Sequence, residues 1–131
     1  MLGALERSQL FLSKSESDLK KAIEKLQDEV LEHEKTQEQI KYIAYHDTLT
    51  GLPNRNLLNE LLVHSITLAE RNNKCMAVLF LDIDGFKMIN DSKGHGMGDQ
   101  ILQEVAERLL KTLRKSDVIA RHGGDEFIVI I

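Results

Sequence analysis

Apolar residues recur at a seven-residue spacing through the first 44 residues of the chain. The two columns of this pattern are Leu5, Leu12, Leu19, Leu26, His33 and Ile40, and Gln9, Glu16, Ile23, Val30 and Gln37. This region has no proline and one glycine, and it is rich in Glu, Lys, Gln and Leu, which favours helix. Ile or Val beside Leu is typical of a parallel two-stranded coiled coil, so residues 1–44 are predicted to form one long helix that pairs with a second copy. A single amphipathic helix packed on its own domain is the alternative.

After residue 44 the apolar spacing changes and predicts shorter elements. A turn is predicted by "HDTLTGLPNR", which contains Gly51 and the only proline, Pro53. A helix is expected from about Asn54 to Arg71. Its apolar side consists of Leu57, Leu58, Leu61, Leu62, Ile66 and Ala69. A central strand covered on both faces is predicted by the continuous apolar run "CMAVLFLDI".

The remaining segments predict two helices and a hairpin. A short helix followed by a glycine-rich loop is expected for "GFKMINDSKGHGMGDQ", and a second amphipathic helix from about Gly98 to Leu113. Two short strands are predicted by "DVIAR" and "EFIVII", joined by "HGGD", where glycine can take a positive φ. After residue 44 the expected order is therefore helix, strand, helix, helix, strand, strand. This order indicates an α/β sandwich with a mixed or antiparallel sheet.

Charge and composition narrow the possible partners. The formal net charge of −4 gives no broad basic surface, so nucleic acid is not an expected partner. No apolar stretch approaches the roughly 20 residues needed to cross a bilayer, and the N-terminal residues lack the features of a secretory signal. We therefore expect a cytoplasmic protein with no direct membrane insertion. Cys75 is the only cysteine, which excludes an internal disulfide, and its apolar surroundings predict a buried thiol.

Acidic residues follow the predicted strands and suggest a metal site. Asp82 and Asp84 lie two apart at the end of an apolar strand, so their side chains are expected on one side. Asp125 and Glu126 lie on the hairpin, where a neighbouring strand can bring one of them beside Asp82. Converging carboxylates suit Mg²⁺ or Mn²⁺ with bound phosphates, which suggests two-metal phosphoryl transfer. Helix-capping acids without a metal are the alternative interpretation.

A second interpretation of the first acidic segment is open. The segment "FLDIDGF" is similar to the first motif of haloacid-dehalogenase-like phosphatases, in which the first Asp is a nucleophile. That motif usually continues with Thr or Val, whereas Phe86 stands here. The phosphatase interpretation also gives no role to the Gly-Gly-Asp-Glu hairpin.

Four segments follow one another in the order "HDTLTGLPNR", "DIDGFKMIND", "GHGMGDQIL" and "RHGGDEF". Together they resemble the motifs of one family, the GGDEF domain of diguanylate cyclases. The resemblance covers residues 45–131, and residues 1–44 resemble the coiled-coil linkers that often precede such domains. It implies a nucleotide-cyclase and polymerase-palm-like fold. The implied reaction condenses two GTP molecules into cyclic di-GMP with release of two pyrophosphates.

The resemblance also implies roles for residues around the acidic segments. Asp82, the carbonyl of Ile83, and Asp125 match metal ligands for Mg²⁺ or Mn²⁺, with two ions in each active site. Asp125 additionally matches the base for the attacking 3′-hydroxyl, and Glu126 matches a second acid. Lys87, in most proteins a solvated lysine, matches a lysine that stabilises the transition state.

Substrate and product sites are implied in the same way. Asn90 and Asp99 match residues that bind the guanine edge, and His95 lies nearby in the motif. The remaining matches are backbone positions for phosphate oxygens at Gly85 and Phe86, clearance for the nucleotide at Gly123 and Gly124, and a product-inhibition site for cyclic di-GMP at Arg114 and Asp117.

Two further expectations follow from the family comparison. Each domain holds one GTP, so ring closure needs a homodimer, and the heptads supply a device for forming it. Family domains continue well beyond the signature, with a lysine and an arginine that grip the phosphates, so residues 45–131 match only the N-terminal half of such a domain. The alternative to a cyclase is therefore an inactive interaction module that binds GTP or cyclic di-GMP.

Overall fold

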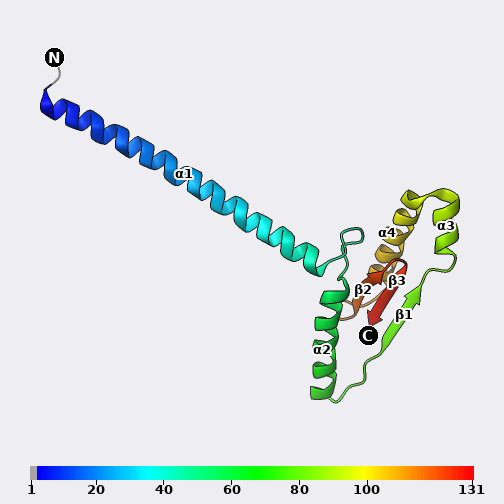
Figure 1. Ribbon diagram of the computed structural model, residues 1–131. Coiled ribbons are helices and arrows are strands. Elements are labelled where there is room, and N and C mark those ends of the chain that lie inside the picture. The colour runs from blue at the N-terminus through cyan, green and yellow to red at the C-terminus, as the bar shows by residue number, and fades with distance from the viewer. Residues whose placement is uncertain (1–2) are drawn as a thin grey trace. The chain divides into compact units, whose positions relative to one another are not determined.

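The computed structural model describes residues 3–131, which form helices and one small sheet (Figure 1). The elements are α1 (Ala4–Tyr45), α2 (Arg55–Arg71), β1 (Val78–Asp82), α3 (Phe86–Lys93), α4 (His95–Thr112), β2 (Val118–Gly123) and β3 (Glu126–Ile130). Their order is the predicted order. The chain divides into two compact units, residues 1–40 and 41–131, which are described separately.

The sheet of the second unit is antiparallel throughout. Its strand order is β1-β3-β2, with β3 in the centre (Figure 1). Along β1 and β3 the paired residues run from Val78 opposite Ile130 to Asp82 opposite Glu126. The sequence left a mixed or an antiparallel sheet open, and the β2–β3 hairpin together with the β1–β3 pairing settles it as antiparallel.

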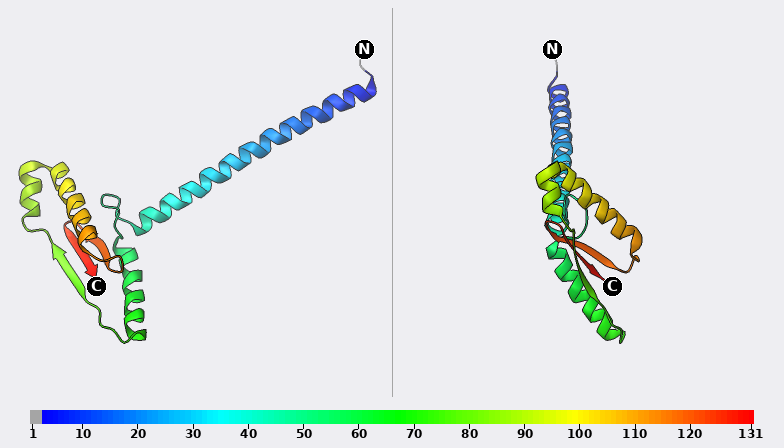
Figure 2. Two further views of the ribbon diagram at one scale, coloured as in Figure 1. Left: turned by 180° about the vertical axis from the view of Figure 1, so that it is seen from behind. Right: turned by 90° about the vertical axis from the view of Figure 1, so that its right-hand side faces the viewer.

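Helices cover both faces of the hairpin strands, as an α/β sandwich requires (Figure 2). Side chains alternate along β3, so Phe127 and Val129 face one side and Ile128 and Ile130 the other. The first pair packs with Leu102 and Ala106 of α4 and with Ile119 of β2. The second pair packs with Leu58 of α2 and Ala120 of β2. The core therefore lies around β2 and β3.

The prediction that β1 is a covered central strand is wrong. Strand β1 lies at an edge of the sheet, all five of its residues are exposed, and Phe80 is 80% exposed. Cys75, predicted to be buried at the start of the same run, is exposed as well. An apolar run indicates a strand suited to cover on both faces, but it does not show which elements supply that cover. Here α2 and α4 pack on β2 and β3 instead.

The prediction of a glycine-rich loop between α3 and α4 is also wrong. Only Gly94 separates the two helices, and Gly98 lies inside α4. Gly98 is buried, and a β-carbon built on it would overlap the side-chain amide of Asn90 and lie 3.2 Å from Cζ of Phe86. Gly98 therefore permits close packing of α3 on α4. A segment rich in glycine can contain a packing glycine of this kind or form a loop, and the sequence alone does not distinguish the two.

Turn 46–54 joins α1 to α2 within the second unit. The Asn54 side chain caps α2, because its Oδ1 accepts from the N–H groups of Asn56 at 3.0 Å and Leu57 at 3.1 Å. Its Nδ2 donates to the carbonyl of Ala44 at 2.9 Å. The Asn54 side chain therefore hydrogen-bonds both the last turn of α1 and the first turn of α2.

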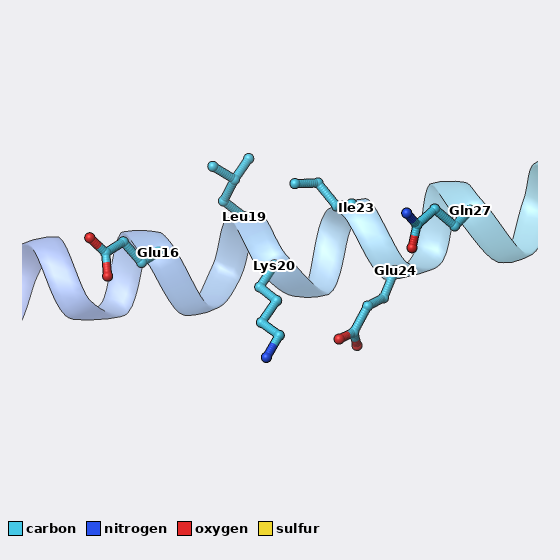
Figure 3. Close-up of a pocket in the computed structure, with 6 residues that line it drawn as sticks. All are labelled: Glu16, Leu19, Lys20, Ile23, Glu24 and Gln27. Carbon is cyan, nitrogen blue, oxygen red and sulfur yellow. The ribbon is translucent and has the colours of Figure 1, made fainter.

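Helix α1 is a single helix of 42 residues, as predicted, and it has no buried residue. Figure 3 shows Leu19 and Ile23 on one side of the helix and Lys20 and Glu24 on the other. The apolar columns remain exposed, with Ile23 47% and Leu26 60% exposed, so they are available to a second helix. Among residues 3–131, no helix combines the length and apolar character that crossing a membrane requires.

Candidate functional site

Three acidic residues, Asp82, Asp125 and Glu126, lie at one end of the sheet. Asp82 is the last residue of β1 and pairs with Glu126, the first residue of β3. Asp125 directly precedes Glu126 in the turn that joins β2 to β3. Oε2 of Glu126 lies 3.3 Å from Nδ1 of His122 across this turn. The fold thus brings together the strand-end acid and the hairpin acids, as the sequence predicted.

The ionisation of Asp82 depends on this proximity. A hydrogen bond shared with Asp125 raises the pKa of Asp82, and partial loss of hydration and the charges of Asp125 and Glu126 raise it further. The backbone N–H of Ile83 acts in the opposite direction. The carboxylates therefore oppose one another's charge, which a bound cation would relieve.

The oxygen atoms at this end of the sheet fit Mg²⁺ or Mn²⁺. Asp82, Asp125 and the backbone carbonyl of Ile83 offer only oxygen ligands, and Mg²⁺ usually takes one or two carboxylates with waters and substrate phosphates completing its shell. Residues 3–131 contain no group of three or more His, Cys, Asp or Glu side chains arranged to hold a metal. Asp84 lies in the turn before α3, where the strand alternation used to place it beside Asp82 no longer applies.

Helix α3 begins a few residues after Asp82. Gly85 occupies its N-cap with a φ of 70°, and no side chain caps the first turn. Phe86 packs against the core and anchors this turn, whereas Lys87 is exposed. The N–H of Phe86 donates to the carbonyl of Ile83 at 3.3 Å, so an anion at the α3 N-terminus would use the N–H groups that follow it in the first turn.

The predicted guanine-binding residues gather where α3 packs on α4. Oδ1 of Asn90 is buried beside Gly98 and has no hydrogen-bond partner. Asp99 follows Gly98 in the chain, and His95 is the first residue of α4; both are exposed. A buried acceptor without a partner is rare in folded proteins, and because this oxygen lies against Gly98, a ligand N–H would reach it only after the Asn90 side chain moved.

The hairpin glycines leave open space beside the acids. Gly124 has a φ of 51°, which confirms the predicted positive φ in this turn. A β-carbon on Gly123 or Gly124 would have no heavy atom within 4 Å. The turn therefore has room for a bulky ligand next to Asp125.

Arg114 and Asp117 lie at the opposite end of the sheet. Asp117 immediately precedes β2, whose first residue, Val118, pairs with Ile130 at the end farthest from Glu126. Oδ2 of Asp117 accepts the backbone N–H of Arg114 at 2.8 Å. Both residues border a hollow of about 560 Å³ lined also by Cys75, Met76, Ala77, Thr112, Leu113 and Ile131. The fold therefore separates them from the carboxylates.

One ion pair near the site was not predicted. Nη1 of Arg121 donates to Oδ1 of Asp47 at 2.9 Å. Burial opposes ionisation of Asp47, but hydrogen bonds from the hydroxyl and N–H of Thr50 and from Arg121 lower its pKa below the ordinary 3.8. Both residues lie within quoted motifs, but they are 74 positions apart, and no spacing rule connects residues at that separation.

The charge opposition around Asp82 yields a stability prediction. A raised pKa means that the folded state holds the Asp82 proton more tightly than the unfolded state, so stability falls as pH rises from about 3.8 through the raised value. Asp125→Asn removes one charge, and we expect it to raise the metal-free melting temperature at neutral pH while abolishing stabilisation by Mg²⁺.

Thermal unfolding at acidic and neutral pH, with and without Mg²⁺, measures both effects. Glu107→Gln is the matched control, because it neutralises an exposed acid of α4. Equal Mg²⁺ stabilisation of wild type and Asp125→Asn would exclude a metal site at this pair.

Comparison with known proteins agrees with the geometry. The family described as "Diguanylate cyclase, GGDEF domain" matches residues 44–131. The chain is 53% identical over 89 residues to the bifunctional diguanylate cyclase/cyclic di-GMP phosphodiesterase MucR of Pseudomonas aeruginosa, covering 68% of this chain and 13% of MucR. It is 44% identical over 102 residues to the cyclic di-GMP phosphodiesterase PdeR of Escherichia coli, covering 78% of this chain and 15% of PdeR.

A solved structure extends the similarity to the N-terminal helix. The coiled coil and GGDEF domain of DgcB from Caulobacter crescentus, in complex with c-di-GMP, matches with a TM-score of 0.73 and 32% identity. The match covers 86% of this chain and 59% of the DgcB chain. The chain thus spans a small part of the two curated relatives and somewhat over half of this structure. It belongs to the GGDEF-domain family of diguanylate cyclases.

Proposed function

We propose that the protein containing this chain condenses two GTP molecules into cyclic di-GMP and releases two pyrophosphates. The observation that carries the proposal is the position of Asp82 opposite Glu126, with Asp125 next to it in the turn, at the end of the sheet where α3 begins. Family membership supplies the reaction class, and the oxygen ligands and the free N-terminus of α3 suit a nucleoside triphosphate.

The proposed metal ligands are Asp82, Asp125 and the carbonyl of Ile83, with Mg²⁺ or Mn²⁺ bound twice in each active site. Bound metal would balance the phosphate charge and acidify the attacking 3′-hydroxyl. Asp125 then accepts the hydroxyl proton, and Glu126 provides a second acid beside it. Lys87, exposed in the first turn of α3, would stabilise charge on the transferring phosphate.

Guanine selectivity is proposed to come from the junction of α3 and α4. Guanine presents N–H donors, and the unpaired Oδ1 of Asn90 and the carboxylate of Asp99 are acceptors. Adenine would leave these acceptors poorly satisfied, which lowers its affinity. His95 would complete the pocket. The backbone at Gly85 and Phe86 would hold phosphate oxygens, while Gly123 and Gly124 leave room for the nucleotide.

A separate product site is proposed at Arg114 and Asp117. The Arg114 guanidinium is suited to bind the guanine or phosphate of cyclic di-GMP, and Arg114 borders the hollow of about 560 Å³ described above. Asp117 would have to release the N–H of Arg114 or share its carboxylate with the ligand. The DgcB structure, a complex with c-di-GMP, supports the ability of such domains to bind this product.

An interaction module that binds GTP or cyclic di-GMP without turnover is the second candidate. It is favoured by the similarity to PdeR, whose name describes a phosphodiesterase rather than a cyclase. The phosphatase interpretation gains no support, because "FLDIDGF" lies inside the segment matched by the GGDEF family.

Product analysis separates these candidates. The 131-residue chain and a version continued to the length of the solved relatives are incubated with GTP and Mg²⁺, with ATP as the matched control. Cyclic di-GMP and pyrophosphate formed from GTP alone would support the cyclase. A folded, dimeric, longer version that binds GTP without forming either product would support the binding module.

A further inference from the structure

The Arg121 side chain joins two turns that are distant in the sequence. Its Nη1 donates to Oδ1 of Asp47 at 2.9 Å, while Nε and Nη2 donate to the carbonyl of Gly124 at 3.0 and 2.7 Å. Its backbone N–H donates to the carbonyl of Pro53 at 3.0 Å. One residue therefore holds turn 46–54 and the hairpin turn at the same time.

The Gly124 carbonyl is directly connected to the proposed metal ligand. It belongs to the peptide group whose nitrogen is that of Asp125, and a peptide group is planar. Two donors on this single oxygen fix the plane of the peptide, and hence the direction in which Asp125 leaves the turn. Gly124 has a φ of 51° and would otherwise be free to take many conformations.

Asp47 in turn fixes Arg121. Its Oδ2 accepts the N–H and the hydroxyl of Thr50 at 2.8 and 2.7 Å, which leaves Oδ1 for the guanidinium. The side chains of Arg121 and Asp47 are 15% and 20% exposed. An ion pair with this little exposure is screened far less than one on the surface, so it restricts the guanidinium more strongly.

Turn 46–54 begins directly after α1 and is bonded to it. His46 donates its backbone N–H to the carbonyl of Tyr42 at 2.8 Å, and Asn54 donates to the carbonyl of Ala44. The last turn of α1 is therefore connected to Gly124 through the hydrogen bond of His46, its covalent neighbour Asp47, and the hydrogen bonds of Arg121.

We propose that Arg121 is a positioning residue that sets the placement of Asp125 against Asp82, and that Asp47 fixes Arg121 for this purpose. The inference rests on the proposed function, because it assumes that this carboxylate pair holds a divalent cation. It assigns to turn 46–54 a part in metal binding, although none of its residues contacts the pair.

The test measures Mn²⁺ binding to the 131-residue chain by the electron paramagnetic resonance signal of the free ion. Arg121→Lys retains a charge for Asp47 but cannot fork onto Gly124, and Arg121→Met removes all the donors. We expect both variants to weaken Mn²⁺ binding about tenfold or more, the scale for residues that orient metal ligands. Asp47→Asn is expected to weaken it less, because Arg121 still reaches Gly124.

A control separates positioning from general stability. Arg108→Met removes the exposed pair of Arg108 with Glu104 and should change neither the Mn²⁺ affinity nor the melting temperature. Arg121→Lys should lose Mn²⁺ affinity while keeping a melting temperature close to wild type and shifting the Asp125 amide resonance. If Arg121→Met fails to fold, the Mn²⁺ affinity of Arg121→Lys alone tests the positioning role.

Two negative results have different meanings. Wild type that binds Mn²⁺ no better than an Asp82→Asn, Asp125→Asn double variant would defeat the metal pair, and the positioning role with it. Wild type that loses Mn²⁺ binding in that double variant, yet keeps full affinity in Arg121→Lys, would overturn the positioning role alone.

Discussion

Asp125→Ala is expected to lower cyclic di-GMP formation by about 10³-fold or more in a version of the protein that turns over GTP. The change removes the proposed base and one of two metal carboxylates together. In Asp125→Ala the carboxylate of Asp82 is no longer opposed by Asp125, but the proposed base is missing, so added Mg²⁺ should restore little activity. Initial rates of pyrophosphate release across a range of GTP and Mg²⁺ concentrations measure the effect.

Two variants control for the loss of a side chain. Asp125→Asn keeps the shape but not the charge, and it should be nearly as inactive as Asp125→Ala. Glu107→Ala removes an exposed acid from α4 and should keep the wild-type rate. An Asp125→Ala protein whose maximal rate is within about tenfold of wild type would show that Asp125 is not the base.

The elements were predictable where local pattern decides the structure. The heptad spacing predicted α1, and the apolar spacing after residue 44 predicted the order of helices and strands. The proximity of Asp82 to Asp125 could also be predicted, because the end of one antiparallel strand and the start of its neighbour lie at the same end of the sheet. For α1 and the order of the elements, a short stretch of sequence contains the physical cause, whereas the meeting of the acids also depends on the pairing of β1 with β3.

The parts that were not predictable depend on contacts between distant segments. The exposure of β1 depends on where α2 and α4 pack, and the position of Gly98 inside α4 depends on the side chain of Asn90. The pairing of Asp47 with Arg121 joins two turns that the sequence shows only as separate motifs. Each of these follows from tertiary packing, which local propensity does not encode.

The apolar columns of α1 give the second large prediction. Ile23→Lys with Leu26→Lys places two charges in the middle of the proposed seam, where each lysine would have to be buried against its symmetry mate. We expect the double variant to sediment as a monomer. Each domain is proposed to hold one GTP, so turnover should fall about a hundredfold or more at low protein concentration.

A matched double variant tests whether position or charge is responsible. Ser17→Lys with Leu31→Lys adds the same two charges at exposed positions outside both columns, and it should remain a dimer with wild-type turnover. Raising the concentration of the Ile23→Lys, Leu26→Lys protein should recover activity in part, because the loss is one of association rather than of chemistry. Unchanged sedimentation of that variant would rule out the heptads as the dimer contact, and the pairing of two active sites would then need another surface.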